Sequence, residues 1–174
     1  QDIRNRIGYR LLCRKAPKVS RHKTFNNLDT AQNIGVFFSL SHQDDLGTVR
    51  AFLSRMSDLG KQAEALGMRE PAINHAEASD SAGISSFTLE KLSLWGYPKS
   101  IAAVSAFVSK QFDMLINLCP EENLCVDYVM ATSKARFKVS PQLSSNDFAD
   151  FILRLSDKSA ICAQTILSRV EEYL

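Results

Sequence analysis

The chain has 174 residues, of which 45% are hydrophobic and 23% are charged, and its formal net charge is +2. This composition suits one soluble domain that buries roughly 70% of the surface exposed by its unfolded form. Only 7 glycines and 5 prolines occur and no heptad register is present, which excludes collagen-like, disordered and coiled-coil classes. No apolar run approaches the roughly 20 residues that cross a bilayer, and the N-terminus has no signal-peptide core. We therefore expect a cytoplasmic protein.

The charge is unevenly distributed along the chain. Residues 1–25 hold eight basic side chains and one acidic one, so this segment is +7 and the remainder is −5. Ile3, Ile7 and Leu11 recur every four residues, with Leu12 beside them, and predict a short helix with one apolar stripe. We expect a basic N-terminal arm over residues 1–25, followed by a single domain over residues 26–174.

Two interpretations of the arm remain open. Its basic side chains could contact anionic phosphate, on lipid headgroups or on nucleic acid. Alternatively, the helix docks its apolar stripe on the domain and points its arginines at water. Aromatic residues that could stack on bases are few, namely Tyr9 and Phe25. The basic residues that the first interpretation assigns to anion contact are Arg4, Arg6, Arg10, Arg14 and Lys15.

Short apolar runs then alternate with helical patterns, which is typical of alternating strands and helices. Strands are predicted over residues 34–38, 61–67, 86–92, 112–118, 136–139 and 148–155. Helices are predicted from Asp44 or Asp45 to Gly60, over 101–110, from 121 to about 134, and over 159–174. A loop or flap is expected between Arg69 and Gly83, and a turn at Trp95–Pro98.

The run over residues 112–118 is apolar at both parities after Asp113, as expected of a central strand that is covered on both faces. Short connections between the predicted units favour parallel strands joined by right-handed crossovers. The sequence therefore predicts an α/β fold, a three-layer α/β/α sandwich with a mostly parallel sheet of Rossmann-like or flavodoxin-like type.

Ligands of such sheets bind beyond the carboxyl ends of the strands, so the candidate site follows from the strand ends. For phosphate binding the loop after the first strand should be rich in glycine, yet it reads SLSHQDDLG and places Asp44 and Asp45 where phosphate would bind. The candidate ligand-binding residues at this edge are Ser39, Ser41, His42, Gln43, Asn117, Cys119, Glu121, Asn123 and Ser140.

Catalytic and metal sites receive little support from the residue patterns. Cys119 and His42 could form a thiolate–imidazole pair, but a cysteine that ends an apolar strand is more often a buried small hydrophobe. The three histidines form no HExxH or i, i+4 pattern, so we expect no metal site. The four cysteines form no CxxC pair and are expected to be reduced thiols. We also expect no cofactor.

Several stretches carry a resemblance to known families. IGVFFS, FDMLINL, a helix that ends TSKA, and RFKVS together resemble a domain-of-unknown-function family of small bacterial proteins, over most of residues 30–172. The later stretches also resemble, more loosely, the N-terminal Rossmann-like half of heptosyltransferase-type glycosyltransferases, in which a glycine stands where this chain has Ser140. That resemblance implies a fold and a half-site, because such an enzyme needs a second half to hold the sugar nucleotide.

These observations lead to three functional expectations. The first is a non-catalytic binding or interaction module, with a protein partner or small ligand that the sequence does not identify. The second is a glycosyltransferase-like half-domain that binds a nucleotide or a nucleotide sugar. The third is association with an anionic membrane or with nucleic acid through residues 1–25.

Overall fold

The computed structural model describes residues 3–40, 43–69, 83–93, 96–142, 147–155 and 161–174. The strands are β1 (Asn33–Ser39), β2 (Gln62–Arg69), β3 (Ile84–Thr88), β4 (Met114–Asn117), β5 (Phe137–Pro141) and β6 (Phe151–Leu153). The helices are α1 (Ile3–Lys15), α2 (Gln43–Asp58), α3 (Ala102–Ser109), α4 (Leu124–Thr132) and α5 (Ala163–Tyr173), with 3₁₀ turns at Ala16–Lys18 and Leu89–Lys91. None of the helices in these ranges is long and apolar enough to span a bilayer.

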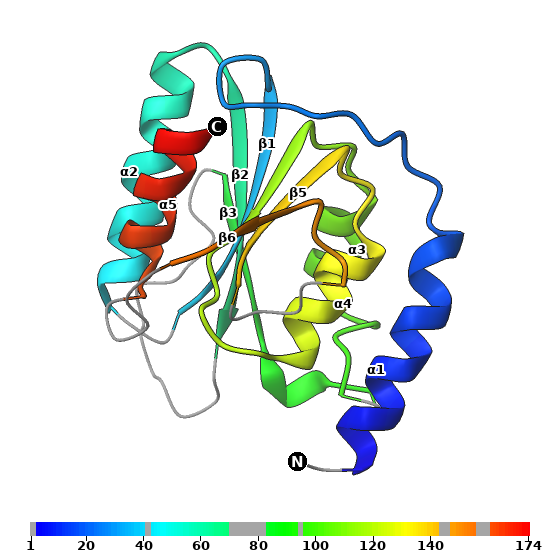
Figure 1. Ribbon diagram of the computed structural model, residues 1–174. Helices are drawn as coiled ribbons and strands as arrows, with labels where there is room; N and C mark the ends of the chain where they lie inside the picture. Colours follow the sequence, from blue (N-terminus) through cyan, green and yellow to red (C-terminus); the bar gives the residue numbers. More distant parts are fainter. Residues whose placement is uncertain (1–2, 41–42, 70–82, 94–95, 143–146, 156–160) are drawn as a thin grey trace.

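The strands form one sheet in which every described pair is parallel, in the order β3-β2-β1-β4-β5-β6. Helices α2 and α5 cover one face, and α1, α3 and α4 cover the other (Figure 1). The predicted three-layer sandwich is therefore confirmed. The order is that of doubly wound dinucleotide-binding sheets rather than the 2-1-3-4-5 order of flavodoxin, and its direction reverses between β1 and β4.

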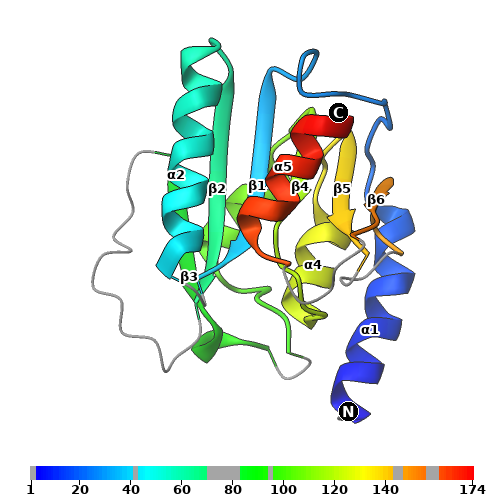
Figure 2. The same ribbon diagram turned by 60° about the vertical axis from the view of Figure 1, so that its left-hand side comes forward.

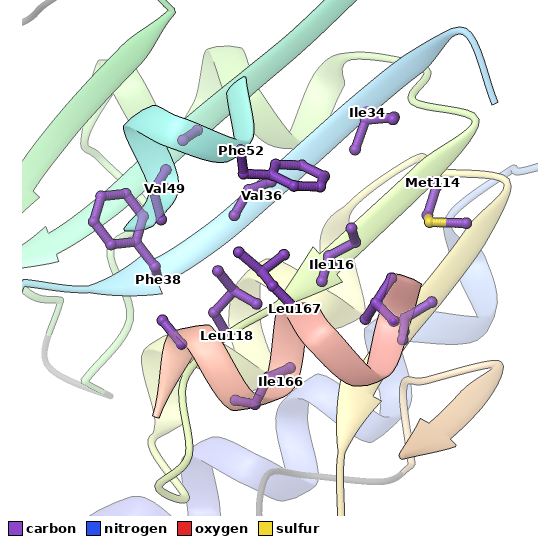
Figure 3. Packing of buried hydrophobic residues seen from close by; sticks show 14 of the residues in the cluster. Ile34, Val36, Phe38, Val49, Phe52, Met114, Ile116, Leu118, Ile166 and Leu167 are labelled. Atoms are coloured by element: carbon purple, nitrogen blue, oxygen red, sulfur yellow. The ribbon is translucent and has the colours of Figure 1, made fainter. Parts of the chain in front are cut away.

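The two cores lie on opposite faces of the central strands because successive side chains of a strand point to opposite sides. Val36 of β1 and Ile116 of β4 face the α2 and α5 layer, where Phe52 and Leu167 lie over them (Figure 3). Phe37, the neighbour of Val36, packs in the other core with residues of α1, α3 and α4. This double coverage explains why the runs of β1 and β4 are apolar at both parities.

Two glycines fix local geometry in the middle of the fold. A Cβ on Gly35 of β1 would lie 2.8 Å from the Phe112 ring, so only glycine leaves room for that ring beside the strand. Gly60 has a φ of 72° and follows α2, where a left-handed residue ends a helix. The predicted stop at Gly60 is confirmed.

The segment between α1 and β1 crosses the amino ends of the strands and is held there by hydrogen bonds along its length. Thr24 donates its backbone N–H to the Arg136 carbonyl, and the Asn26 side chain donates to the Asp113 carbonyl at 3.0 Å. Lys61 donates from Nζ to three carbonyls of the turn before β1, at 2.6 to 2.9 Å. These bonds make the segment 19–32 a strap that joins α1 to the sheet.

The strand and helix bounds differ from the sequence-based ones by one or two residues at most elements and by more at four of them. The strand predicted at 86–92 begins at Ile84 and ends at Thr88, because β3 pairs only with Ala65–Arg69 and the chain then turns. The helix predicted from Glu121 begins at Leu124, after Asn123 caps it. The strand predicted at 148–155 is limited to β6, and the last helix begins at Ala163. Most of the predicted loop between Arg69 and Gly83 lies outside the described residues.

Candidate functional site

The carboxyl ends of β1 and β4 meet where the strand order reverses, which is the place where open α/β sheets bind ligands. Ser39 is half-buried at the end of β1, and Asn117 is fully buried at the end of β4. Ser41 and His42 lie outside the described residues. Gln43 begins α2, and the structure does not describe its side chain. The thiolate–imidazole pair of Cys119 and His42, which the sequence pattern disfavours, therefore falls outside what the structure tests.

The polar side chains of β4 and β5 bond to one another at this edge. The Asn117 amide donates from Nδ2 to the Ser140 hydroxyl at 3.1 Å. Its Oδ1 accepts the backbone N–H of Cys119 at 3.0 Å. Both Asn117 and Ser140 are completely buried. This arrangement ties two strand ends together and turns the loop after β4, which is a structural use of residues whose position alone suggested ligand contact.

The thiol of Cys119 is poorly suited to act as a nucleophile. Burial raises its pKa well above the ordinary value, and the nearby charges of Asp45 and Glu121 raise it further, as does Cys125. Burial, aided by Asp127, likewise raises the pKa of Cys125 to about 12. Both groups are therefore protonated thiols at neutral pH, whereas the reactive form of cysteine is the thiolate. All four cysteines are free, as predicted.

Two helices begin at this edge, and neither offers an uncompensated positive end. Asp44 and Asp45 lie in the first turn of α2. Asn123 caps α4, because its Oδ1 accepts the Cys125 N–H at 2.8 Å. Glu121 is exposed and precedes α4 rather than lying in its first turn. Carboxylates at helix starts stabilise the helices and repel phosphate, so this edge disfavours an anionic ligand.

A groove on the α2 side of the sheet is a second possible site. A groove of about 660 Å³ lies between α2 and the amino-terminal half of β2, with Arg50, Asp58, Lys61 and Glu64 among its lining residues. Lys61 is held by the three carbonyls of the strap, and Glu64 is paired with Lys110. Within the part of the chain that the structure describes, no three His, Cys, Asp or Glu side chains gather to hold a metal ion.

Helix α1 lies at the edge of the helical layer on one face of the sheet. It packs along α4 and forms the outer margin of its layer, its N-terminal end projecting beyond α4 (Figure 2). Gly8 and Leu12 are buried in this contact, and the Tyr97 hydroxyl donates to the Gly8 carbonyl at 2.8 Å. Leu11 of the predicted stripe also packs against the core on this face of the sheet, whereas Ile7 is 39% exposed.

The opposite side of α1 is basic. Arg6, Arg10 and Arg14 are exposed and follow one another every four residues, and we call them the arginine face. No acidic residue occurs in α1. Lys15 is also exposed, with its Nζ 6.0 Å from the centre of the Tyr97 ring. The side chain of Arg4 is outside the described residues. The docked helix therefore still displays a basic face to solvent.

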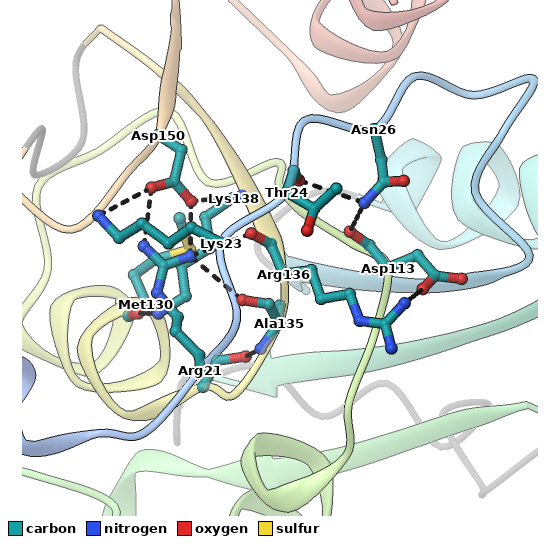
Figure 4. A network of polar contacts seen from close by, with 11 residues as sticks. Arg21, Lys23, Thr24, Asn26, Asp113, Met130, Ala135, Arg136, Lys138 and Asp150 are labelled. Carbon is teal, nitrogen blue, oxygen red and sulfur yellow. Dashed lines mark hydrogen bonds and ion pairs between the residues drawn. The ribbon is translucent and has the colours of Figure 1, made fainter.

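Sequence reasoning missed a polar cluster beneath the strap, formed by Arg21, Lys23, Lys138 and Asp150 (Figure 4). Lys138 lies in the interior of β5 and is only 2% exposed. Its Nζ donates to the Met130 carbonyl near the end of α4. The sequence RFKVS indicates a buried lysine, because Lys138 is flanked by apolar residues in a predicted buried strand. It does not indicate that the lysine bonds to the Met130 carbonyl.

Comparisons with known proteins identify a family and nothing more specific. No curated protein and no solved structure matches this chain significantly. A family model described as a family of unknown function, DUF6913, matches residues 4–174. This range begins inside α1 and ends with the last residue of the chain, so the basic helix is part of the matched unit. The chain belongs to the family of unknown function DUF6913.

Proposed function

We propose that the protein is a non-catalytic binding module, that its docking surface is the arginine face of α1, and that its partner presents phosphate groups. The observation that carries this proposal is the orientation of α1. Gly8 and Leu12 are used for packing, which leaves Arg6, Arg10 and Arg14 in a single exposed row.

The spacing of the row suits a surface that repeats a small anion. An α-helix rises about 1.5 Å per residue, so adjacent arginines of the row are about 6 Å apart along the axis. A guanidinium donates two parallel hydrogen bonds to a phosphate and stays charged at every physiological pH. The row has no acidic neighbour within α1 to neutralise it.

Docking of the helix lowers the entropic cost of binding. An isolated helix of 13 residues is marginal in water, and a basic segment that had to fold on its partner would lose affinity to that ordering. Here the packing on α4 and the bond from Tyr97 to Gly8 hold α1 before any partner arrives. The remaining contribution is electrostatic, so binding should weaken steeply with added salt.

The test is elution of the full chain from phosphocellulose in a salt gradient. The variant Arg6→Gln, Arg10→Gln, Arg14→Gln removes the row, and glutamine keeps a good helix propensity. The control variant Lys99→Gln, Lys134→Gln, Arg154→Gln removes the same charge from exposed positions outside α1. We expect the first variant to elute at clearly lower salt than the control. Equal elution of the two variants would show that net charge, rather than the arginine face, governs retention.

A second candidate function is nucleotide or nucleotide-sugar binding by a transferase-like half-domain. The strand order favours it, because doubly wound sheets of this order bind dinucleotides at the point where the order reverses. The carboxylates of Asp44 and Asp45 at the start of α2 oppose it. A thermal-shift screen against nucleotides and nucleotide sugars separates the two, since a ligand at 100 times its dissociation constant adds about 2.7 kcal/mol. A clear shift would favour the half-domain.

A further inference from the structure

The outward side of α1 carries an apolar residue within its basic row. Ile7 is 39% exposed, and it lies next to Arg6 in sequence and close to Arg10 and Arg14 on the helical wheel. Leu11, one turn further along, is half-buried at the edge of the docked side. Interfacial helices combine basic side chains with apolar ones that enter the headgroup layer, and on this side of α1 Ile7 is the exposed apolar side chain.

On this basis, and resting on the proposed function, we infer that the phosphate-bearing partner is the surface of an anionic lipid bilayer. The arginines would pair with headgroup phosphates. Ile7 would leave water at the level of the headgroups, where an apolar side chain gains free energy. The buried side of α1 stays on α4, so the domain rests on the surface of the bilayer.

The position of α1 in the fold suits a flat partner. Figures 1 and 2 show α1 at the outer margin of its layer from both directions, with its N-terminal end beyond the other helices of that face. A straight helix at a margin meets a plane along its length, so Arg6, Arg10 and Arg14 can touch the plane together. Such simultaneous contact makes the three charges act as one site.

The same face is poorly equipped to recognise nucleic acid. Its described side chains are Arg6, Ile7, Arg10, Cys13 and Arg14. None of these except arginine reads base edges, and Ile7 would face phosphate and sugar. Tyr9, the aromatic residue of α1, donates its hydroxyl to Asp147 and packs its ring against Phe148 at 5.8 Å, so it is engaged by the domain rather than displayed for stacking.

The experiment is co-sedimentation of the full chain with vesicles of phosphatidylcholine containing phosphatidylglycerol, with pure phosphatidylcholine as the reference. Each basic residue near an anionic surface contributes about a fivefold gain in partition. The arginine-face variant should therefore bind roughly 100-fold more weakly than the control triple variant. Ile7→Gln should weaken binding by roughly fivefold and leave the folded state intact, because Ile7 is already exposed.

A parallel arm measures binding to duplex DNA at the same salt. Preference for vesicles, together with a weaker Ile7→Gln variant, supports the inference. Binding to DNA without binding to anionic vesicles overturns it while leaving the phosphocellulose result, and hence the proposed function, in place. An unchanged affinity of Ile7→Gln for vesicles also overturns it, because the apolar contact is what separates a bilayer from other phosphate surfaces. If the wild-type chain neither binds anionic vesicles nor is retained on phosphocellulose, both the inference and the proposed function are contradicted.

Discussion

Arg21 holds the carboxylate of Asp150 with both of its terminal nitrogens, at 2.6 Å and 2.7 Å (Figure 4). The same guanidinium donates to the Ala135 carbonyl, and Asp150 accepts the backbone N–H of Lys138 at 3.0 Å. One ion pair thus joins the strap to β5 and to the start of β6. Paired, bidentate contacts of this kind are stronger than ordinary hydrogen bonds.

Replacing Asp150 by Asn should destabilise the fold. The side chain of Asp150 is only 15% exposed, so the change leaves the Arg21 charge without its counter-ion in a partly buried place. We expect a loss of about 2 to 3 kcal/mol in the free energy of unfolding, measured by urea titration. Asp58→Asn, at an exposed position of α2, is the matched control and should stay within about 0.5 kcal/mol of the wild type.

The same pair predicts a specific response to acid. Burial favours the neutral form of Asp150, but the hydrogen bonds and charge of Arg21, the Lys138 N–H and the charge of Lys23 outweigh it and hold the pKa below its ordinary value of 3.8. The unfolded chain therefore takes up the proton first, and this part of the stability is lost as pH falls through the lower folded pKa. Wild type should lose more stability in acid than Asp150→Asn. Parallel pH profiles would contradict this.

Lys138 should make stability depend on pH in the neutral to alkaline range. Its pKa is lowered from 10.5 to about 7, first by burial and then by the charges of Arg21 and Lys23, against the opposing effect of Asp150. Between about pH 7 and pH 10 folding releases this proton, so the free energy of unfolding rises with pH. Relative to Lys138→Met, wild type should gain a few kcal/mol across that interval. Equal slopes in denaturant titrations would exclude a buried, titrating lysine.

A lysine occupies this buried position for a structural reason. The Met130 carbonyl belongs to the last turn of α4, where carbonyls lack helical partners. Lys134 would be its usual donor, but the N–H of Lys134 bonds to Val108. Lys138 supplies the missing donor from the neighbouring strand, and α4 has no basic residue in its own last turn. Because a neutral amine still donates, Lys138→Met should lose this bond at every pH.

The cysteines should fall into two reactivity groups. Cys13 and Cys162 are exposed, whereas Cys119 and Cys125 are buried with raised thiol pKa values. Under native conditions we expect iodoacetamide to label the first pair and to spare the second until the chain unfolds. Peptide mass spectrometry assigns the sites. Rapid labelling of Cys119 in the native protein would contradict this prediction and would support a nucleophilic role for its thiol.

Periodicity could predict the α/β/α sandwich because apolar runs of strand length cannot be covered unless helices pack on both faces. It could not predict which apolar residues of α1 are buried. Leu12 is fully buried and Leu11 packs beside it, whereas Ile7 is 39% exposed, and the buried Gly8 accepts a hydrogen bond from Tyr97. A glycine in a helix lowers the stability of the helix and also lets a neighbouring element pack closely against it, and the sequence alone reveals only the first of these effects.

The sequence could place the candidate ligand-binding residues at the strand ends, but it could not predict their contacts with one another. Position placed Asn117 and Ser140 at the edge where ligands bind, and the structure agrees with that position. Their burial depends on the spacing of β4 and β5, which lets Asn117 bond to Ser140. Such pairing needs the sheet register, which is a tertiary property. Lys138 shows the converse, since its partner carbonyl is contributed by a helix that no motif connects to it.

The docking register of α1 can be tested by comparing two truncations. Leu12 is fully buried and Ile7 is exposed, so Leu12→Ala should cost about 2 to 4 kcal/mol and Ile7→Ala less than about 1 kcal/mol, measured by urea titration. Both changes improve or preserve helix propensity, so the difference reports packing rather than helix formation. A larger loss for Ile7→Ala would place Ile7, rather than Leu12, in the contact with α4.

Binding of an anionic bilayer through the arginine face is tested most directly by arginine footprinting of the full chain with phenylglyoxal, with and without anionic vesicles. Arg6, Arg10 and Arg14 are exposed in the structure and should react in the free protein. On vesicles, all three should be protected together, while exposed Arg154 keeps its reactivity. Protection of Arg154 alone, or equal reactivity of the three arginines with and without vesicles, would contradict binding of an anionic bilayer through α1.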